Sequence, residues 1–382
     1  MKKVRIACLG LGSRAKGLIE VYKNHESVEF VAFCDIIKDN AANFAAYYNT
    51  KYGKNAKGFA DYETMSRESS YDALFIACDP DIQVDYACDA MNKGVHVMTE
   101  VPAAYTIDQC WNLVNTVKKT GCKYQLAEQT RYWNFIVKWR EMAEKGKFGK
   151  IIYAEGEYLH YEPAWDFFEN IHTGEKIWTG DMSYHSNPDY KLTWRGRLMS
   201  SPIYYLPHTL SPLLSITGGR IKKVSCVGTR PSSYVTDGLP ARDIETALMY
   251  NSDDVVFSVR AGFTSPYGNK NGTHAHWYQI KGTERTVEWT RNTIDLPKMW
   301  TPEEGWTNQN WTLEDPDAEE YIKNSAHGGT DWYPIHYFVD AILNDKTPPM
   351  DVYKAVETAA PAILAAESAN NGGVLIEVPD FR

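Results

Sequence analysis

A glycine-rich turn near the start of the chain carries the clearest chemical signal. The segment Gly10-Leu11-Gly12-Ser13-Arg14-Ala15 directly follows the apolar run Val4 to Leu9 and precedes a helical pattern. The two glycines permit a tight turn and the close approach of a pyrophosphate, Ala15 is small enough for helix-on-strand packing, and the helix N-terminus supplies amide donors. Asp35 ends the next apolar run, where a carboxylate accepts hydrogen bonds from ribose hydroxyls.

This combination predicts a dinucleotide site. The carboxylate of Asp35 would repel a 2′-phosphate, and no arginine follows it immediately, so NAD is favoured over NADP. The alternative is a glycine-rich turn in another kind of α/β protein, with Asp35 only capping a helix.

His208, in the segment Tyr204-Tyr205-Leu206-Pro207-His208, is a candidate general base. Oxidation of a secondary alcohol needs a group that accepts the hydroxyl proton as the hydride leaves, and histidine suits this task because its ordinary pKa is near ~6.5. The alternative is a buried histidine that hydrogen-bonds backbone groups at a helix start. The residues alone support both interpretations equally.

Tyr158 and His160 alternate along one expected strand, so their side chains share a face. Tyr158 could hydrogen-bond a substrate or assist proton transfer, or it could simply belong to a sheet core. His274 and His276 have a spacing that could hold a metal, but no acidic or thiol partner lies nearby in the sequence, so we predict no metal site. Asp331 follows two glycines and precedes a helical pattern, which predicts a helix N-cap.

Aromatic residues are abundant, with 12 tryptophans and 25 tyrosines, and they cluster after the first third of the chain. Flat rings can stack on the C–H faces of a pyranose at little cost in entropy. This enrichment supports a carbohydrate ligand, and we include Arg195 and Tyr205 from this region among the candidate substrate-binding residues.

The first third of the chain alternates apolar runs with amphipathic stretches, which is typical of βαβ units. Helices are predicted over Ile82 to Lys93 and Ile107 to Thr120, ending at Gly94 and Gly121. Five strands with helical crossovers predict an open, doubly wound parallel sheet. The expected strands are Val4 to Leu9, Val28 to Cys34, Ala73 to Ala77, Val95 to Thr99 and Lys123 to Leu126.

After about residue 131 the pattern changes to strands without regular helical crossovers, which predicts an α+β domain with an open, mostly antiparallel sheet. We therefore divide the chain into a Rossmann domain at 1–130 and a second domain at 131–382, for substrate binding and oligomerisation. Trp300 to Pro316 is expected to be a long surface loop. The other expected elements are helices over Tyr132 to Lys145, Trp332 to Leu343 and Val352 to Asn370, and strands over Ile151 to His160, Lys222 to Val227, Ile244 to Tyr250, Val255 to Phe263, Trp277 to Lys281, Thr286 to Trp289 and Val374 to Val378.

Composition narrows the class of protein. A length of 382 residues exceeds what one hydrophobic core usually serves, and a net charge of -9 argues against nucleic acid as a partner. Seven cysteines without a CxxC pair are typical of reduced thiols and predict a cytoplasmic protein. No apolar run approaches the roughly 20 residues that span a bilayer, so no membrane association is expected.

Several segments resemble one family of enzymes. The N-terminal pattern, the segment Gly94 to Pro102 and the later α+β domain together resemble the Gfo/Idh/MocA oxidoreductases over essentially the whole chain. Within that superfamily the chain most resembles the NAD-dependent glycosidases of glycoside hydrolase family 109, which are α-N-acetylgalactosaminidase-like. The segments that carry this likeness are Glu100 to Ala104, Glu155 to His160, Tyr205 to His208, His327 to Asp331 and Val378 to Phe381.

The resemblance implies a Rossmann domain followed by an α/β domain whose open sheet forms the substrate pocket and often an oligomer interface. It implies that His208 is catalytic and that Glu100 and Val101 lie beside the nicotinamide ribose. It also implies that the loop from Cys78 to Gln83, which contains Asp79, borders the cofactor, and it adds Gln129 to the cofactor-binding candidates. For the segment from His327 to Asp331, the resemblance raises an alternative to the helix N-cap, namely contact of His327 or Asp331 with the substrate or the cofactor.

The chain also departs from the superfamily pattern. Val101 stands where sugar dehydrogenases commonly have a catalytic lysine, and Tyr204 stands where they commonly have an aspartate. Relative to the glycosidases, Gln83 replaces a usual histidine and Gln129 a usual asparagine.

Three functions are consistent with these residues. The first is NAD-dependent oxidation of a ring hydroxyl of a sugar or glycoside by a homo-oligomer, with C3 as the favoured position, His208 as base and Tyr158 positioning the hydroxyl. The second is an NAD-dependent glycosidase, in which oxidation at C3 acidifies the C2 proton, the C1 substituent is eliminated, water adds and the ketone is reduced again. This route does not need the carboxylate pair of ordinary glycosidases. The third is a non-catalytic NAD-binding sensor, motivated by the missing lysine.

Overall fold

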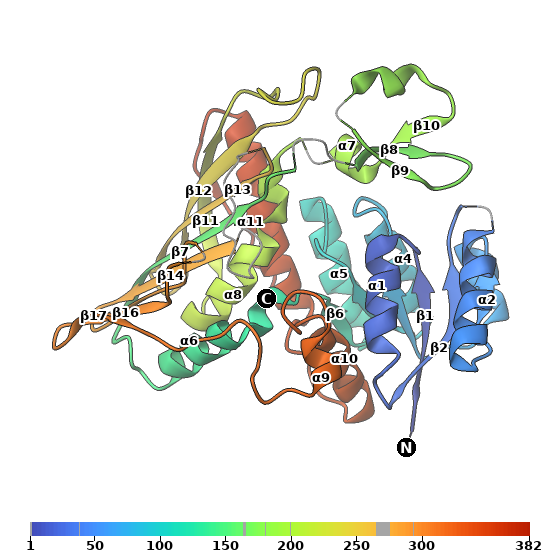
Figure 1. Cartoon of the computed structure of the whole chain (residues 1–382), viewed down its shortest axis with the longest axis horizontal. Helices are drawn as coiled ribbons and strands as arrows, with labels where there is room; N and C mark the ends of the chain where they lie inside the picture. Colours follow the sequence, from blue (N-terminus) through green and yellow to red (C-terminus); the bar gives the residue numbers. More distant parts are fainter. Residues whose placement is uncertain are drawn as a thin grey trace.

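The N-terminal part of the structure, a computed structural model, is a parallel sheet of six strands in the order β3-β2-β1-β4-β5-β6 (Figure 1). The structure describes the chain except for residues 1, 38, 163–165, 180, 199, 265–275 and 293. The predicted doubly wound sheet is confirmed, and β3 is a strand that the sequence analysis missed. The strands are β1 (Val4–Leu9), β2 (Val28–Cys34), β3 (Lys57–Phe59), β4 (Ala73–Ile76), β5 (His96–Thr99) and β6 (Tyr124–Leu126).

Helices connect these strands and cover the sheet. Because both faces are covered, a central strand such as β4 is apolar along its whole length, with every side chain from Ala73 to Ile76 fully buried. α5 begins with a capping box between Thr106 and Gln109 and ends at Gly121, as its sequence predicts. The connecting helices are α1 (Ser13–Tyr22), α2 (Asn40–Tyr52), α3 (Tyr62–Glu68), α4 (Gln83–Asn92) and α5 (Ile107–Thr120).

The second part of the chain forms a larger sheet of nine strands, ordered β17-β16-β15-β14-β7-β13-β12-β11-β18. β7 and β13 pair in parallel, and the other neighbours are antiparallel. The predicted mostly antiparallel α+β domain is confirmed. Its strands are β7 (Ile151–Leu159), β11 (Ile221–Gly228), β12 (Ile244–Asn251), β13 (Val256–Gly262), β14 (His276–Gly282), β15 (Thr286–Glu288), β16 (Lys298–Thr301), β17 (Gly305–Asn308) and β18 (Ile376–Glu377).

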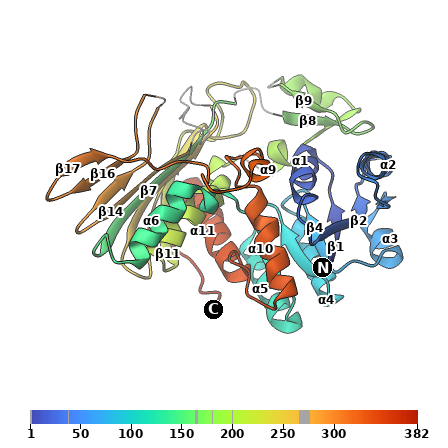
Figure 2. The ribbon, with the colours of Figure 1, turned by 60° about the horizontal axis from the view of Figure 1, so that its bottom comes forward.

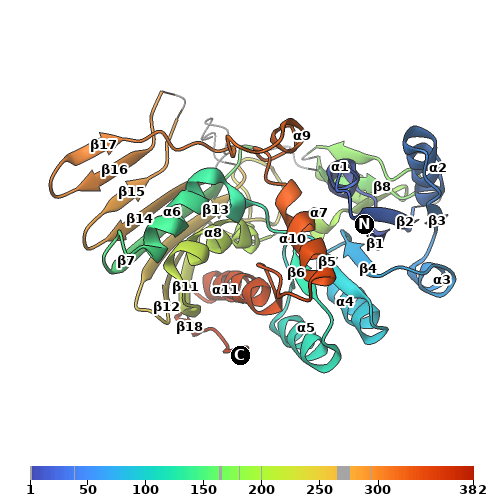
Figure 3. The ribbon, with the colours of Figure 1, turned by 90° about the horizontal axis from the view of Figure 1, so that it is seen from below.

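Three helices cover one face of this large sheet: α6 (Asn134–Glu144), α8 (Pro207–Thr217) and α11 (Val352–Asn370) (Figure 3). α11 also packs against α5 and β6, so it lies between the two sheets. α10 (Trp332–Leu343), which follows the short α9 (Glu320–Lys323), returns to the first domain and packs on α1 and β1. The site therefore forms where the ends of β5 and β6 meet the start of α8. The turn η1 (Thr130–Tyr132), which follows β6 in the chain, packs against α8, and η3 (Pro202–Tyr205) leads into α8.

Two predictions for the second domain need correction. Half of the expected loop from Trp300 to Pro316 is instead the hairpin of β16 and β17, whose turn at 302–304 is followed by Gly305 with φ of 67°. A separate sheet of three strands, ordered β10-β8-β9, was not predicted at all. It comprises β8 (Asp166–Asn170), β9 (Lys176–Trp178) and β10 (Tyr190–Leu192), with η2 (Met182–Ser186) before β10 and α7 (Trp194–Leu198) after it. Among the described residues, none of the helices has the length and apolarity to cross a bilayer.

Candidate active site

A cleft of about 730 Å³ lies at the carboxyl ends of β1, β2 and β4, where the strand order reverses. Ligands of doubly wound sheets bind at this switch point. Gly10, Gly12, Ser13, Asp35 and Asp79, all predicted to bind the cofactor, line this cleft.

The two glycines of the turn have different roles. Gly10 has φ of 90°, and a Cβ there would lie 2.4 Å from the carbonyl oxygen of Ala77, so only glycine fits between β1 and β4. A Cβ on Gly12 would meet no atom within 4 Å, because Gly12 faces the open cleft. The space beside Gly12 fits a pyrophosphate that approaches the backbone closely.

Asp35 ties the end of β2 to the glycine-rich turn. Its Oδ2 accepts a hydrogen bond of 2.8 Å from the amide of Leu11, and its Oδ1 accepts one of 2.8 Å from the amide of Ile37. Each carboxylate oxygen keeps a lone pair for a further donor. The position and the chemistry of Asp35 therefore fit a ribose diol in the cleft.

The loop after β5 is held by the side chain of Gln83. The Nε2 of Gln83 donates to the carbonyl oxygens of Glu100 and Pro102, and Gln83 is 1% exposed. Gln83 thus shapes the segment that contains Glu100 and Val101. Gln129 differs from Gln83, because its buried Oε1 has no hydrogen-bond partner within the described part of the chain. An orphaned amide oxygen fits a donor from a bound molecule, such as a carboxamide group.

Arg14 is occupied by two carboxylates. It pairs with Asp331 through two hydrogen bonds of 2.7 and 2.9 Å, and its Nε lies 3.2 Å from Glu100 Oε1. Burial alone would raise the pKa of Asp331, but Arg14 and His327 lower this pKa to about 2. The predicted N-cap role of Asp331 is wrong, because its side chain caps no backbone amide of α10 and instead binds Arg14 and His327.

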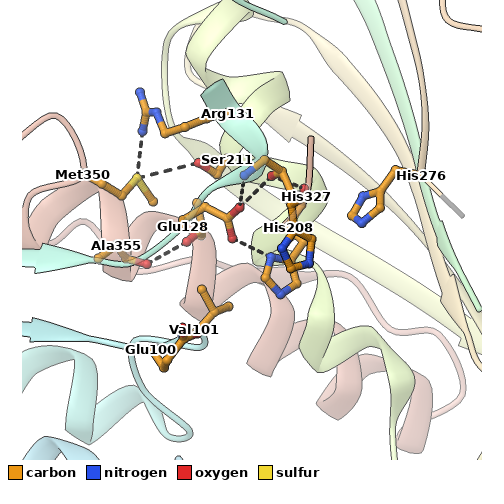
Figure 4. A network of polar contacts seen from close by, with 12 residues as sticks. Glu100, Val101, Glu128, Arg131, His208, Ser211, His276, His327, Met350 and Ala355 are labelled. Carbon is orange, nitrogen blue, oxygen red and sulfur yellow. Dashed lines mark hydrogen bonds and ion pairs between the residues drawn. The ribbon is translucent and has the colours of Figure 1, made fainter. Parts of the chain in front are cut away.

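Glu128 and His208 form a dyad at the end of β6 (Figure 4). The Oε2 of Glu128 lies 2.7 Å from Nδ1 of His208, and Glu128 is 0% exposed. Its Oε1 accepts the amide of Thr130 at 2.8 Å and the hydroxyl of Thr130 at 2.6 Å. Burial alone would raise the pKa of Glu128, but the charge and hydrogen bond of His208, together with the donors of Thr130, lower it. The carboxylate holds the Nδ1 side of the ring and leaves Nε2 to exchange a proton.

Aromatic rings surround His208 on the side of the large sheet. Tyr158 stacks on His208 and on Tyr205, with ring centroids 5.3 and 5.4 Å apart and interplanar angles of 15°. The ring of His276 meets the edge of the Tyr158 ring, with centroids 4.7 Å apart, and the ring centroids of His160 and Tyr158 are 4.5 Å apart. Burial raises the pKa of the Tyr158 hydroxyl, so this hydroxyl is a hydrogen-bond donor near neutral pH.

Arg195, predicted to bind substrate, lies beside this cluster. Burial raises the pKa of Tyr205 to about 12, although the charge and hydrogen bond of Arg195 oppose the shift. Arg195 also lines a small cavity together with Glu162 and Phe263. The structure thus brings Tyr158, His160, Arg195, Tyr205 and His208 together.

The sequence analysis missed Glu128, Thr130 and Tyr278. Tyr278 donates from its hydroxyl to the carbonyl oxygen of His208 at 2.9 Å. A signal for Glu128 did exist, because an acidic residue two positions after a buried parallel strand lies at the edge of the sheet where ligands bind. Nδ1 of His276 lies 3.0 Å from the hydroxyl oxygen of Tyr278. No cluster of potential metal ligands occurs among the described residues, and His274 lies outside them.

Comparison with known proteins defines the class of the molecule. Residues 4–128 match the family described as "Oxidoreductase family, NAD-binding Rossmann fold", and residues 132–382 match "Glycosyl hydrolase 109, C-terminal domain". The first domain is therefore an NAD-binding Rossmann fold of an oxidoreductase family. Since the second match covers more than half of the sequence, the chain belongs to the glycosyl hydrolase 109 family, as its resemblance to this family implied.

Relatives and solved structures agree with this assignment. The chain is 26% identical to an alpha-N-acetylgalactosaminidase of Tannerella forsythia, over 99% of this chain and 86% of that protein. It is 24% identical to glycosyl hydrolase family 109 protein 1 of Bacteroides thetaiotaomicron, over 100% and 85%. Its fold is shared by scyllo-inositol dehydrogenase of Lactobacillus casei, solved with NAD(H) and scyllo-inositol, with a TM-score of 0.72, 17% identity and coverage of 98% and 99%.

Proposed function

We propose that this protein oxidises a ring hydroxyl of a sugar or glycoside with NAD as cofactor, and that His208 is the base. The observation that carries the proposal is the dyad of Glu128 and His208, with Tyr158 stacked on the same imidazole. β5 and β6 are parallel neighbours, so the dyad lies at the same edge of the sheet as the nucleotide cleft.

NAD, when bound in the cleft, supplies the hydride acceptor for the carbon that carries the hydroxyl. Glu128 holds the imidazole by Nδ1 and stabilises the positive charge that forms on the ring. His208 takes the hydroxyl proton on Nε2. Tyr158 donates a hydrogen bond that orients the substrate. The aromatic rings around Tyr158 exclude water and offer flat surfaces for the sugar.

The second candidate is the glycosidase that returns to its starting redox state. The match of residues 132–382 to the C-terminal domain of glycosyl hydrolase 109 favours it, and so do relatives such as the alpha-N-acetylgalactosaminidase of Tannerella forsythia. Val101, which replaces the lysine of sugar dehydrogenases, also favours the glycosidase. In this candidate His208 and Glu128 keep the same role in the oxidation.

Product analysis separates the two candidates. The protein is incubated with NAD and a panel of aryl glycosides, and the products are identified by mass spectrometry. A keto glycoside with stoichiometric NADH indicates the dehydrogenase, whereas free sugar and aglycone without net NADH indicate the glycosidase. If NAD does not bind, or if no glycoside or free sugar in a broad panel is changed, both candidates are wrong.

We further propose a cytoplasmic homo-oligomer with a nucleotide domain at 1–130 and a substrate domain at 131–382. All seven cysteines are free thiols, which supports a reducing compartment. The face of the large sheet opposite α8 exposes apolar side chains, which supports self-association through this face. These side chains are Val227, Leu248, Val256, Trp300 and Trp306. Light scattering after size-exclusion chromatography tests the oligomer.

A further inference from the structure

The sheet of β8, β9 and β10 lies over the nucleotide domain, although its residues belong to the second domain in the sequence. We call β8, β9, β10 and α7 the wall sheet. In the sequence it lies between β7 and α8, but in space it sits above α1 and apart from the large sheet (Figures 1 and 2). This position sets it over the carboxyl ends of the parallel strands.

The wall sheet forms one side of the nucleotide cleft. The opposite side is the glycine-rich turn with Asp35 and Ile37. Glu169 and Lys191 of the wall sheet lie 3.7 Å apart within the cleft. A dinucleotide gripped by the turn would therefore be enclosed between the two sides. The wall-sheet residues that line the cleft are Glu169, Thr173, Gly174, Lys176, Lys191, Leu192, Thr193, Trp194 and Arg197.

Contacts at both ends of the wall sheet join it to the first domain. At the α7 end the hydroxyl of Tyr105 donates to the carbonyl oxygen of Leu198 at 2.7 Å. Arg197 bridges two carboxylates of the loop after β4, with Nη2 2.7 Å from Asp79 and Nη1 3.0 Å from Asp81. At the other end, the turn after β8 packs on the residues that follow Asp35. A Cβ on Gly174 would lie 3.8 Å from Cβ of Ile37.

We propose that the wall sheet retains the dinucleotide, and that release of the cofactor requires separation of Arg197 from Asp79 and Asp81. The proposal rests on the proposed binding of NAD in this cleft. In this proposal Asp79 helps to close the cleft through its ion pair with Arg197. The contact of Gly174 with Ile37 closes the cleft at the end where Asp35 would hold the adenosine ribose.

A reversible cross-link tests the proposal directly. The Cβ separation of Gly174 and Ile37 matches the roughly 3.8 Å found across disulfides. The variant Gly174→Cys/Ile37→Cys is loaded with NADH, and release is followed in stopped flow by chasing with excess NAD. Trp194 lines the cleft, so energy transfer from protein to NADH reports occupancy. We expect release to be at least about tenfold slower in the oxidised form than in the reduced form of the same variant. The reduced form controls for the strain of a cysteine at position 174, where φ is 71°.

The variant Arg197→Gln tests the contact of Arg197 with Asp79 and Asp81, and it should change the rate of NADH release in the direction opposite to the cross-link. It removes two partly exposed ion pairs, so NADH release should become about 3- to 10-fold faster. Arg5→Gln is the matched control, because Arg5 and Asp72 form an ion pair of similar exposure at the amino-terminal end of β1, away from the cleft. Its release rate should equal that of the unmodified protein.

The outcomes separate the two proposals. If the unmodified protein shows no saturable NADH signal, the proposed function itself is wrong. If NADH binds, but release is the same in oxidised and reduced cross-linked protein and in Arg197→Gln, the wall sheet does not retain the cofactor.

Discussion

Oε2 of Glu128 lies 2.7 Å from Nδ1 of His208, and this contact joins the last parallel strand of the nucleotide domain to the first turn of α8 in the second domain. The pair spans the junction between domains, so the geometry of the proposed base, His208, depends on how the two domains are joined. α11, which packs against both sheets, fixes that junction.

Replacing Glu128 with Gln should reduce kcat by about 100-fold, because the imidazolium that forms during proton transfer loses its charged partner. Binding of NADH, measured by fluorescence, should stay near its normal affinity.

His208→Ala should abolish turnover, and the double variant should be no worse than His208→Ala, because the two residues act as one unit. Unchanged kcat in Glu128→Gln would remove the dyad from the mechanism, and NADH binding with no turnover in the unmodified protein would favour a sensor.

Replacing Tyr158 with Phe tests the hydroxyl without removing the ring. The stacking on His208 and Tyr205 should persist, so the midpoint of thermal unfolding should change little. Loss of one substrate hydrogen bond should lower kcat/KM by about 10- to 100-fold. Tyr205→Phe serves as the comparison on the neighbouring ring. An effect on stability equal to the effect on catalysis would assign Tyr158 to the core alone.

How far the sequence predicts this fold depends on the length and regularity of each element. The bounds of β1, β2, α5, α10 and α11 coincide with the predicted segments, because long apolar runs and helical periodicity leave little choice of structure. β9 and β10 have only three residues each, too few for a visible alternation. The hairpin of β16 and β17 was mistaken for a loop, because its tryptophans lie on the exposed face and its composition is polar.

The candidate site was predictable where a residue acts through the local backbone. Gly10, Gly12 and Asp35 belong to one strand-turn-helix pattern, and the structure places all of them on the cleft. The place of Glu128 after a buried strand indicated the ligand-binding edge of the sheet, but neither the burial of Glu128 nor its contact with the distant His208 can be read from the sequence. Arg14 was expected at the cofactor, but its partner Asp331 comes from the opposite end of the chain, and only the packing of α10 on α1 brings the two together.

Asp35 should control cofactor choice. Replacement by Asn removes the charge that repels a 2′-phosphate and weakens the acceptor for the ribose hydroxyls. We expect the affinity for NAD to fall by about tenfold. The ratio of the affinity for NAD to the affinity for NADP should fall by more than about tenfold. Calorimetric titration with both nucleotides measures this directly. Because Asp35 also accepts the amides of Leu11 and Ile37, circular dichroism is needed to show that the turn remains folded. An unchanged ratio of affinities would place the ribose elsewhere.

Glu245 should make stability depend on pH near neutrality. It is 0% exposed and accepts hydrogen bonds from Ser201 and from the amide of Ile203, with Arg242 at 3.3 Å. Burial raises the pKa of Glu245 from 4.5 to about 7, although these donors and Arg242 oppose the shift. The folded state therefore binds a proton that the unfolded state has lost between pH 4.5 and 7.

It follows that the free energy of unfolding decreases as pH rises through this window, and that the loss is complete above the folded-state pKa. A shift of this size corresponds to about 3 kcal/mol. In Glu245→Gln this contribution should vanish, so the free energies of unfolding of the two proteins should converge or cross as pH is raised from 5 to 8 in urea titrations. A constant difference between Glu245→Gln and the unmodified protein across this range would mean that Glu245 stays ionised in the fold.

Because η3 leads directly into α8, ionisation of Glu245 should also loosen the backbone that carries His208.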